Sequence, residues 1–231
     1  MTQTQTLQNG TPVCTAGMHR FGTDALLLAG FCRPRRAEQA VDLCSGCGIV
    51  SLCWHDLGHR GPCSAVEIDP DGTALLHRAL ELEPQAGHIR PLAADLRTLA
   101  PQPPMNAHLV ACNPPYFSAG PQSPDPVRAA ARHEQSCTLG DAAACAARLL
   151  RDGGRFAFCY PPDRLAQAFA ALARCGLEPK RLVFVKKEPD CAPRLFLCEA
   201  QQGRAPGLRV LPDLITGTGG VGYQYLAVNH R

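Results

Sequence analysis

The sequence predicts an α/β fold in which helices cover both faces of a doubly wound, mostly parallel sheet. Short apolar strands alternate with helical patterns along the chain, and this alternation is typical of parallel sheets with right-handed crossovers. A length of 231 residues with 45% hydrophobic content suits one globular domain with a large core. Residues 1–38 come before the first strand and form a small N-terminal extension.

The expected elements follow in chain order. Strands are expected at residues 40–43, 64–68, 88–92, 109–112, 155–160, 182–185 and 195–199. Helices are expected at about residues 49–56, 71–83, 139–150 and 162–175. Asp69 is the expected N-cap of the second helix, with Pro70 in its first turn, and Gly176 ends the last helix.

Composition excludes several classes of protein. The apolar runs are too short to span a membrane, and the polar N-terminus lacks the pattern of a signal peptide, so a cytoplasmic protein is expected. The 13 cysteines are odd in number, scattered and often inside apolar runs, which is typical of reduced core residues. Cys44 and Cys47 have redox or zinc spacing, but no second pair completes a four-ligand site, and no metal is expected.

Positive charge is concentrated in the second half of the chain. Residues 1–124 hold 8 Lys/Arg against 10 Asp/Glu, and residues 125–231 hold 15 against 10. A polyanion would therefore dock on the second half. The predicted phosphate contacts are Arg128, Arg132, Lys180, Arg181, Lys186, Lys187 and Arg194. The alternative for these residues is a solvated basic face.

The turn after the first strand predicts the charge of the ligand. Gly46 and Gly48 allow close approach to the backbone, and Asp42 lies at the end of the strand. The turn lacks the GxGxxG spacing by which a dinucleotide pyrophosphate meets a helix N-terminus. An acid at this position opposes a pyrophosphate but attracts an ammonium or sulfonium, so a cationic amino-acid ligand is expected.

Two further strands also end in acids. Glu67, followed by Ile68, lies where a carboxylate can hold a ribose diol, and Asp95, followed by Leu96, can accept from an adenine amino group. The alternative for each acid alone is a role in solvation or helix capping. Their order and spacing along the chain carry the prediction.

The tetrapeptide Asn113-Pro114-Pro115-Tyr116 follows the apolar run 108–112 and is the predicted catalytic loop. Proline has no N–H and keeps the preceding residue out of the helical region, so the Asn113 side-chain oxygen and the Pro114 carbonyl can both point outward as acceptors. Tyr116 adds a flat ring. Two acceptors beside a ring fit an exocyclic amino group on a stacked base, or a side-chain amide.

These motifs together resemble class I S-adenosylmethionine-dependent methyltransferases of the amino-group branch. The motifs are Asp42-Leu-Cys-Ser-Gly-Cys-Gly48, Glu67-Ile-Asp69, Asp95-Leu96 and Asn113-Pro-Pro-Tyr116. The segments 19–31, 132–134 and 194–203 narrow the resemblance to the tRNA (adenine-N6)-methyltransferase family that modifies the adenine 3′ of the anticodon in a valine tRNA. The resemblance implies a Rossmann-like, seven-stranded domain over residues 39–231, with residues 1–38 packed over the cofactor site.

The resemblance also implies site residues. The cofactor S-adenosyl-L-methionine, with S-adenosyl-L-homocysteine as product, would be bound by Phe21, Thr23, Asp24, Asp42, Cys44, Gly46, Gly48, Glu67, Ile68, Asp95, Leu96 and Asn113. Cys44 stands where many relatives have glycine, which predicts that this position needs no positive φ. His133 either contacts substrate or is structural.

Direct methyl transfer is the expected reaction, with Asn113 and Pro114 holding the amine and no side-chain base required. A protein-glutamine N5 methyltransferase would use the same acceptors but normally has a helical N-terminal domain. Guanine-N2 rRNA and DNA adenine methyltransferases would usually add a recognition domain. A non-catalytic RNA-binding protein with a vestigial loop is the fourth alternative, and the intact Asn113 and Tyr116 argue against it.

Overall fold

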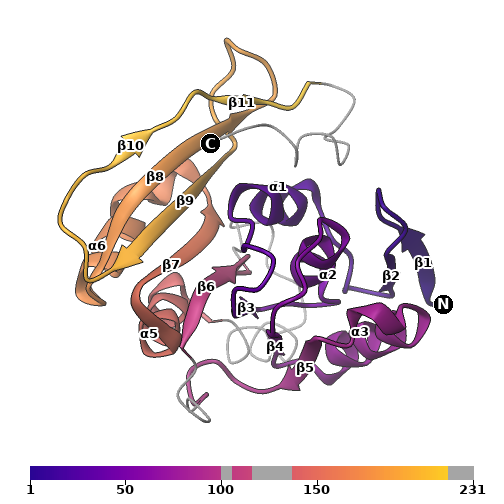
Figure 1. Cartoon of the computed structure of the whole chain (residues 1–231). Coiled ribbons are helices and arrows are strands. Elements are labelled where there is room, and N and C mark those ends of the chain that lie inside the picture. Colours follow the sequence, from indigo (N-terminus) through magenta and orange to yellow (C-terminus); the bar gives the residue numbers. More distant parts are fainter. Residues whose placement is uncertain (100–105, 116–136, 218–231) are drawn as a thin grey trace, which may run out of the picture.

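The computed structural model describes residues 1–99, 106–115 and 137–217. Its main sheet runs in the order β10-β8-β9-β7-β6-β3-β4-β5, with β11 also beside β8 (Figure 1). The strands are β3 (Ala40–Leu43), β4 (Cys63–Glu67), β5 (Ile89–Ala93), β6 (Ala107–Cys112), β7 (Leu150–Tyr160), β8 (Leu177–Lys186), β9 (Leu195–Gln202), β10 (Arg209–Val210) and β11 (Leu214–Ile215).

The predicted mostly parallel sheet is confirmed. All neighbouring strands are parallel except β9, which is antiparallel to both β7 and β8. The seven expected strands are all present among the described residues. The two-residue strands β10 and β11 were not expected, and both add to the outer edge of β8.

The helices cover the two faces of the sheet separately. They are α1 (Thr23–Phe31), α2 (Ile49–Asp56), α3 (Pro70–Leu82), α5 (Leu139–Leu149) and α6 (Leu165–Arg174), with the short 3-10 turns η1 (Pro84–Ala86) and η2 (Pro162–Arg164). Along β6, Leu109 and Ala111 join the core with α1, α2 and α3, whereas Val110 and Cys112 join the core with α5 and α6. Because side chains alternate along a strand, both faces of β6 are buried and its sequence is a continuous apolar run.

Local signals set the helix starts. The Asp69 side chain accepts a 3.0 Å hydrogen bond from the Asp71 N–H, and Pro70 is the first residue of α3, as expected. Thr138 and Asp141 form a reciprocal capping box at the start of α5. Gly48 has φ 79°, and a Cβ there would lie 2.5 Å from a Leu76 methyl, so the β3–α2 turn packs directly against α3.

The observed strand boundaries differ most from the predicted ones in β7 and β8. β3 and α2 lie at the expected residues, but β7 and β8 each begin five residues earlier than expected, at Leu150 and Leu177. Pairing with β9 extends β8 past Pro179, where the register shifts. Proline is tolerated in a strand at such an irregularity. The partner strand therefore lengthens β8 beyond its own apolar pattern.

Residues 1–38 share the core of the sheet domain. The hairpin of β1 (Gln3–Thr6) and β2 (Pro12–Thr15) contributes Val13 and Cys14 to the cluster under α1 and α2. The Asp56 carboxylate, at the end of α2, accepts from the backbone N–H groups of Asn9 and Thr11 at 3.1–3.2 Å. The division at residue 38 stays a prediction.

No described helix has both the length and the apolar character that a membrane span requires.

Three histidines, His55, His59 and His88, lie together near the C-terminal end of α2. The His88 ring is 5.1 Å from the His55 ring and 5.6 Å from the His59 ring, centroid to centroid. Burial lowers the pKa of all three imidazoles, that of His88 to about 4. A lowered pKa means that the folded state resists protonation, so the cluster stabilises the fold above pH about 6.5 and loses that contribution as pH falls toward 4.

The Tm of His88→Gln should therefore fall less than that of the wild type between pH 7 and pH 4.5, because the variant has one fewer imidazole that must stay neutral in the folded state. About 1 kcal/mol of difference would appear as roughly 2–4 °C in Tm for a chain of this size. The exposed His77→Gln is the matched control and should follow the wild-type curve. Parallel curves for all three proteins would show that the cluster does not titrate as described.

Candidate active site

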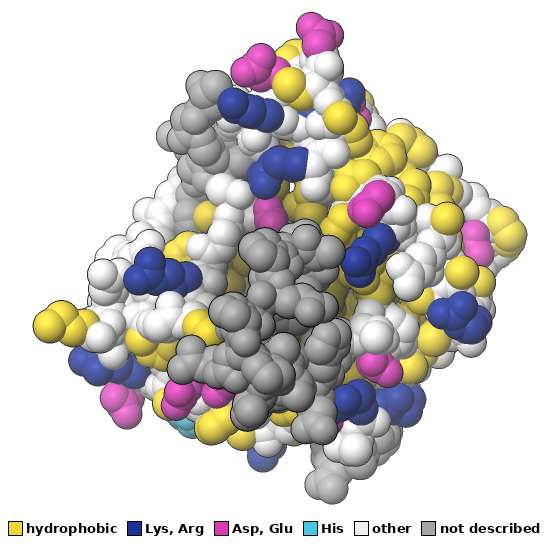
Figure 2. All heavy atoms as spheres, turned by 180° about the vertical axis from the view of Figure 1, so that it is seen from behind, with side chains coloured by type: hydrophobic (Ala, Val, Ile, Leu, Met, Phe, Trp, Pro, Cys, Tyr) yellow, Lys and Arg dark blue, Asp and Glu magenta, His cyan; other side chains and the backbone are white. Residues whose placement is uncertain are grey.

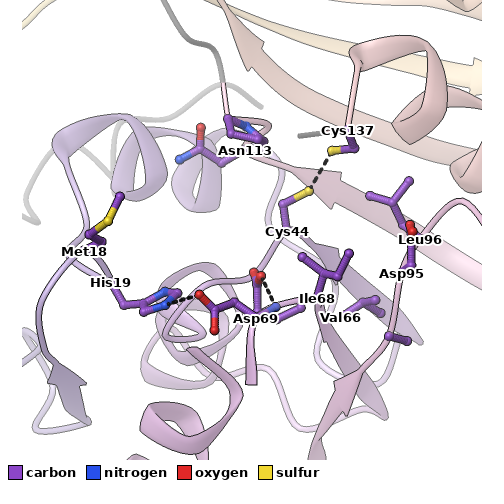
Figure 3. Close-up of a pocket in the computed structure, with 13 residues that line it drawn as sticks. Met18, His19, Cys44, Val66, Ile68, Asp69, Asp95, Leu96, Asn113 and Cys137 are labelled. Carbon is purple, nitrogen blue, oxygen red and sulfur yellow. Dashed lines mark hydrogen bonds and ion pairs between the residues drawn. The ribbon is translucent and has the colours of Figure 1, made fainter. Parts of the chain in front are cut away.

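A pocket of about 270 Å³ opens at the carboxyl ends of the parallel strands β3, β4, β5 and β6 (Figure 3). Parallel sheets bind ligands at this edge. Seven predicted site residues line it, namely Cys44, Glu67, Ile68, Asp95, Leu96, Asn113 and Pro115. Six further residues that were not predicted from the sequence also line it, namely Met18, His19, Val66, Asp69, Ala94 and Cys137.

Glu67 connects two strand ends. One carboxylate oxygen accepts from the Gly46 N–H at 2.7 Å, and the other accepts from the Asp69 N–H at 2.9 Å. The first bond fixes the glycine turn after β3, and the second fixes the start of α3. Each oxygen keeps a second lone pair, so the same carboxylate can also accept from the two hydroxyls of a ribose.

Asp42 lies behind the turn. It is 1% exposed, and its carboxylate accepts from the Ser51 N–H in α2 at 3.1 Å. Burial raises its pKa to about 7, with Glu67 adding to the rise and the Ser51 hydrogen bonds opposing it. Asp42 therefore supports the turn from the core side, and its charge changes near neutral pH.

Cys44 corrects one expectation. Its φ is +55°, in the left-handed region, so the position does need a positive φ and a non-glycine residue is held there by its surroundings. Its sulfur lies 3.2 Å from that of Cys137, and Figure 3 shows the two side chains pointing toward one another. Hydrogen bonding and burial raise the pKa of both thiols, so both remain protonated at neutral pH.

Cys44 and Cys47 differ in their surroundings. Cys47 is buried and burial raises its pKa to about 11, whereas Cys44 contacts Cys137 instead. No group of three or more potential metal ligands is found within residues 1–99, 106–115 and 137–217.

Asp95 is held by a neighbour. Both of its carboxylate oxygens accept from the Arg97 side chain, at 2.7–3.0 Å, and one also accepts from the Arg97 N–H. These hydrogen bonds and the guanidinium charge keep the pKa of Asp95 below its usual value. The arginine fixes the carboxylate at the edge of the pocket, with lone pairs remaining for an amino group.

Asn113 directly follows β6 and is half-buried, and the next residue, Pro114, is buried. Its side-chain oxygen accepts from the thiol of Cys159 on β7, with oxygen and sulfur 2.9 Å apart. Cys159 is fully buried and was assigned no role from the sequence. The thiol sets the orientation of the carboxamide. Tyr116 lies outside the described residues.

Six of the predicted cofactor-binding residues do not line the pocket, namely Phe21, Thr23, Asp24, Asp42, Gly46 and Gly48. Phe21 packs against the core cluster, and Thr23 and Asp24 each accept from the Arg194 guanidinium at 3.2 Å. Met18 and His19, which come just before them, line the pocket instead, and His19 contacts the Asp69 carboxylate at 3.0 Å. The N-terminal segment thus reaches the pocket, but through Met18 and His19, which precede the predicted residues in the chain. Gly46 and Gly48 support the turn without lining the cavity.

Most of the described residues in the predicted phosphate-binding set contact the protein itself. Arg181 pairs with the buried Glu199, Lys186 with Asp213 and Arg194 with Asp24, at 2.8–3.3 Å. Lys180 donates to the Ala205 carbonyl. Figure 2 shows lysine and arginine side chains spread over one face among acidic ones rather than gathered in a single patch. Arg128, Arg132 and His133 lie outside the described residues.

The pocket is acidic. Glu67, Asp69 and Asp95 line it, and no lysine or arginine does so among its described lining residues. Arg97 balances one of the three charges from outside the lining. Such a cavity favours a cationic ligand.

Comparison with curated proteins identifies close sequence relatives. A tRNA1(Val) (adenine(37)-N6)-methyltransferase of Shewanella amazonensis is 34% identical over 188 residues, covering 78% of this chain and 77% of the relative. The protein of the same name from Tolumonas auensis is 30% identical, covering 77% and 74%. The chain belongs to this methyltransferase family. No protein-family model matches the sequence.

The fold comparison agrees with that family. A crystal structure of a predicted O-methyltransferase from Agrobacterium tumefaciens superimposes with a TM-score of 0.69 over 86% of this chain and 90% of that chain, at 22% identity. A geranyl diphosphate methyltransferase in complex with SAM gives 0.55 at 14% identity, over 77% and 84%. This chain therefore has the class I methyltransferase fold.

Asp42→Asn should raise Tm more at pH 8 than at pH 5. The pKa of Asp42 is higher in the folded than in the unfolded protein, so the wild type loses stability as pH rises from about 4 through about 7 and the carboxyl group ionises. Asparagine cannot ionise, so the variant avoids this loss. Thermal melts across this range measure the difference between variant and wild type. Asp71→Asn, an exposed acid on α3, is the control. A difference that stays constant with pH for Asp42→Asn would contradict the burial effect.

Proposed function

We propose that this chain is an S-adenosylmethionine-dependent methyltransferase that modifies the N6 amino group of the adenine 3′ of the anticodon in a tRNA. The single observation that carries the proposal is the position of Asn113, which follows β6 and lines the acidic pocket with its carboxamide hydrogen-bonded to Cys159. Family membership supports the substrate, because relatives at 30–34% identity are named as tRNA1(Val) (adenine(37)-N6)-methyltransferases.

The pocket fits the cofactor by charge and by hydrogen-bonding capacity. S-adenosylmethionine carries an ammonium and a sulfonium, which an acidic lining favours. The free lone pairs of Glu67 would hold the ribose hydroxyls, and Asp95 with Leu96 would hold the adenine. The turn from Asp42 to Gly48 would lie against the methionine part. The cofactor supplies an activated methyl group and leaves as S-adenosylhomocysteine.

The protein's contribution to the reaction is alignment. An adenine amino group attacks poorly because its lone pair is delocalised into the ring. When Asn113 and the Pro114 carbonyl accept its two N–H bonds, the lone pair can point toward the methyl group. The Cys159 thiol keeps the Asn113 oxygen in the accepting orientation. Tyr116 would stack on the base, and no side-chain base is needed because the methylated nitrogen is strongly acidic.

The phosphate contacts of the tRNA are a finer part of the proposal. The ion pairs of Arg181, Lys186 and Arg194 reduce the charge that each can offer to RNA. Lys187, Arg128 and Arg132 stay as predicted contacts. A tRNA substrate also supports the predicted cytoplasmic location.

Mass spectrometry of nucleosides tests the function directly. Unmodified valine tRNA, incubated with the protein and S-adenosylmethionine, should yield N6-methyladenosine within the fragment that contains the anticodon loop. Asn113→Ala is the negative control. Formation of N2-methylguanosine instead, or methyl transfer only to glutamine in protein, would replace the adenine assignment with one of the two alternatives.

Cys159→Ala should lower kcat about fivefold with little change in the KM for S-adenosylmethionine. The estimate follows from losing one hydrogen bond of about 1 kcal/mol that orients Asn113. Cys159→Ser should retain activity, because a hydroxyl also donates. Cys145→Ala, a fully buried thiol in α5, controls for loss of packing. Equal loss in the serine and alanine variants would rule out the positioning role.

A further inference from the structure

A second cavity adjoins the cofactor pocket. It has a volume of about 320 Å³ and lies between the start of α5 and one side of α6. Pro115 and Cys137 line both cavities, so the two meet beside the catalytic loop. Figure 1 shows α5 and α6 on the same side of the sheet, and the two helices pack against each other. A ligand in the second cavity would therefore lie next to Asn113.

One wall of this cavity comes from α6 and from the turn before it. Gln167, Ala171 and Arg174 line the cavity from α6, and their spacings of four and three residues place them on one face of the helix. Arg164, the last residue of η2, lines the cavity just before α6 begins. At about 1.5 Å per residue, the backbones of the two arginines are roughly 15 Å apart. The cavity, called the groove below, thus has one arginine at the start of α6 and one at its end.

The two cavities have opposite charge. The cofactor pocket is lined by three carboxylates and no lysine or arginine, whereas the groove is lined by two arginines and no carboxylate, among the described residues in each case. Neither Arg164 nor Arg174 takes part in an ion pair within the described parts of the chain. The Asp141 carboxylate near the groove is occupied by the N–H and hydroxyl of Thr138.

The ring of Tyr160 steadies the first arginine. The Arg164 guanidinium carbon lies 6.0 Å from the centre of that ring, which itself packs against Phe158 and Phe196. A cation held over an aromatic face loses less freedom when it binds an anion, because its position is already restricted. Arg164 differs in this respect from Arg181, whose charge is already paired with Glu199.

We propose that the groove between α5 and α6 binds the RNA backbone next to the target adenosine, with Arg164 and Arg174 contacting separate phosphates. This inference rests on the proposed function and names the surface that holds its substrate. A separation of about 15 Å matches about four nucleotides of a stacked strand at roughly 3.4 Å each. The cationic cofactor and the anionic substrate would then enter from opposite sides and meet at Pro115.

The test compares two double variants of equal charge. Arg164→Gln/Arg174→Gln should raise both the Kd and the KM for tRNA about tenfold, which corresponds to about 1.4 kcal/mol, and leave S-adenosylmethionine binding and kcat at saturating tRNA nearly unchanged. The slope of log K against log salt should fall by about 1.4, or about 0.7 for each single-strand phosphate contact. Arg78→Gln/Arg90→Gln, two exposed arginines on α3 and β5, should behave as the wild type.

Neutral phosphates locate the contact on the RNA. In an anticodon stem-loop, methylphosphonates within about four nucleotides of the adenosine should weaken binding to the wild type but not further weaken binding to the Arg164→Gln/Arg174→Gln variant. An unchanged Kd and salt slope in that variant, while the wild type methylates tRNA normally, would overturn the groove assignment alone. A wild type that methylates no tRNA would instead refute the proposed function. If inorganic phosphate competed with tRNA as strongly as the stem-loop does, the groove would be a site for small anions and not an RNA-binding surface.

Discussion

The carboxylate of Glu67 is the constraint on which the site depends. It accepts from the Gly46 N–H on one side and from the Asp69 N–H on the other, at 2.7 and 2.9 Å. The glycine turn after β3 and the start of α3 are thereby fixed relative to each other, and Gly48 lets the turn lie directly against Leu76. A charge-assisted hydrogen bond to backbone is stronger than a neutral one, so this arrangement is rigid before any ligand binds.

Opposite charge distinguishes the two cavities. Carboxylates lie at the ends of β4 and β5, while Arg164 before α6 and Arg174 at its end form no ion pair within the described residues. Many other basic side chains that the sequence offers are neutralised within the fold, as in the network of Arg155, Arg181, Glu38 and Glu199 at 2.9–3.3 Å. What decides whether an arginine can hold RNA is therefore its neighbour in space rather than the local density of positive charge along the chain.

The strand-end motifs were predictable because they are local. A parallel strand buried on both faces is a continuous apolar run, and the residue that follows it lies at the edge of the sheet. Cys44, Glu67, Asp95 and Asn113 could therefore be placed at one edge without coordinates, and all four line the pocket. Phe21, Thr23 and Asp24 stay predicted cofactor contacts. In the structure Thr23 and Asp24 accept from the distant Arg194, a contact that the local sequence does not record.

The sequence by itself determined the order of elements, the edge at which the pocket opens and the acidic character of that edge, since each follows from side chains within a few residues of a strand end. Only the tertiary structure decided which distant side chains complete the site. Cys137 meets Cys44 across 93 positions of the chain, and Cys159 meets Asn113 across 46. Such contacts depend on how whole helices and strands pack, and no periodicity in the sequence records that packing.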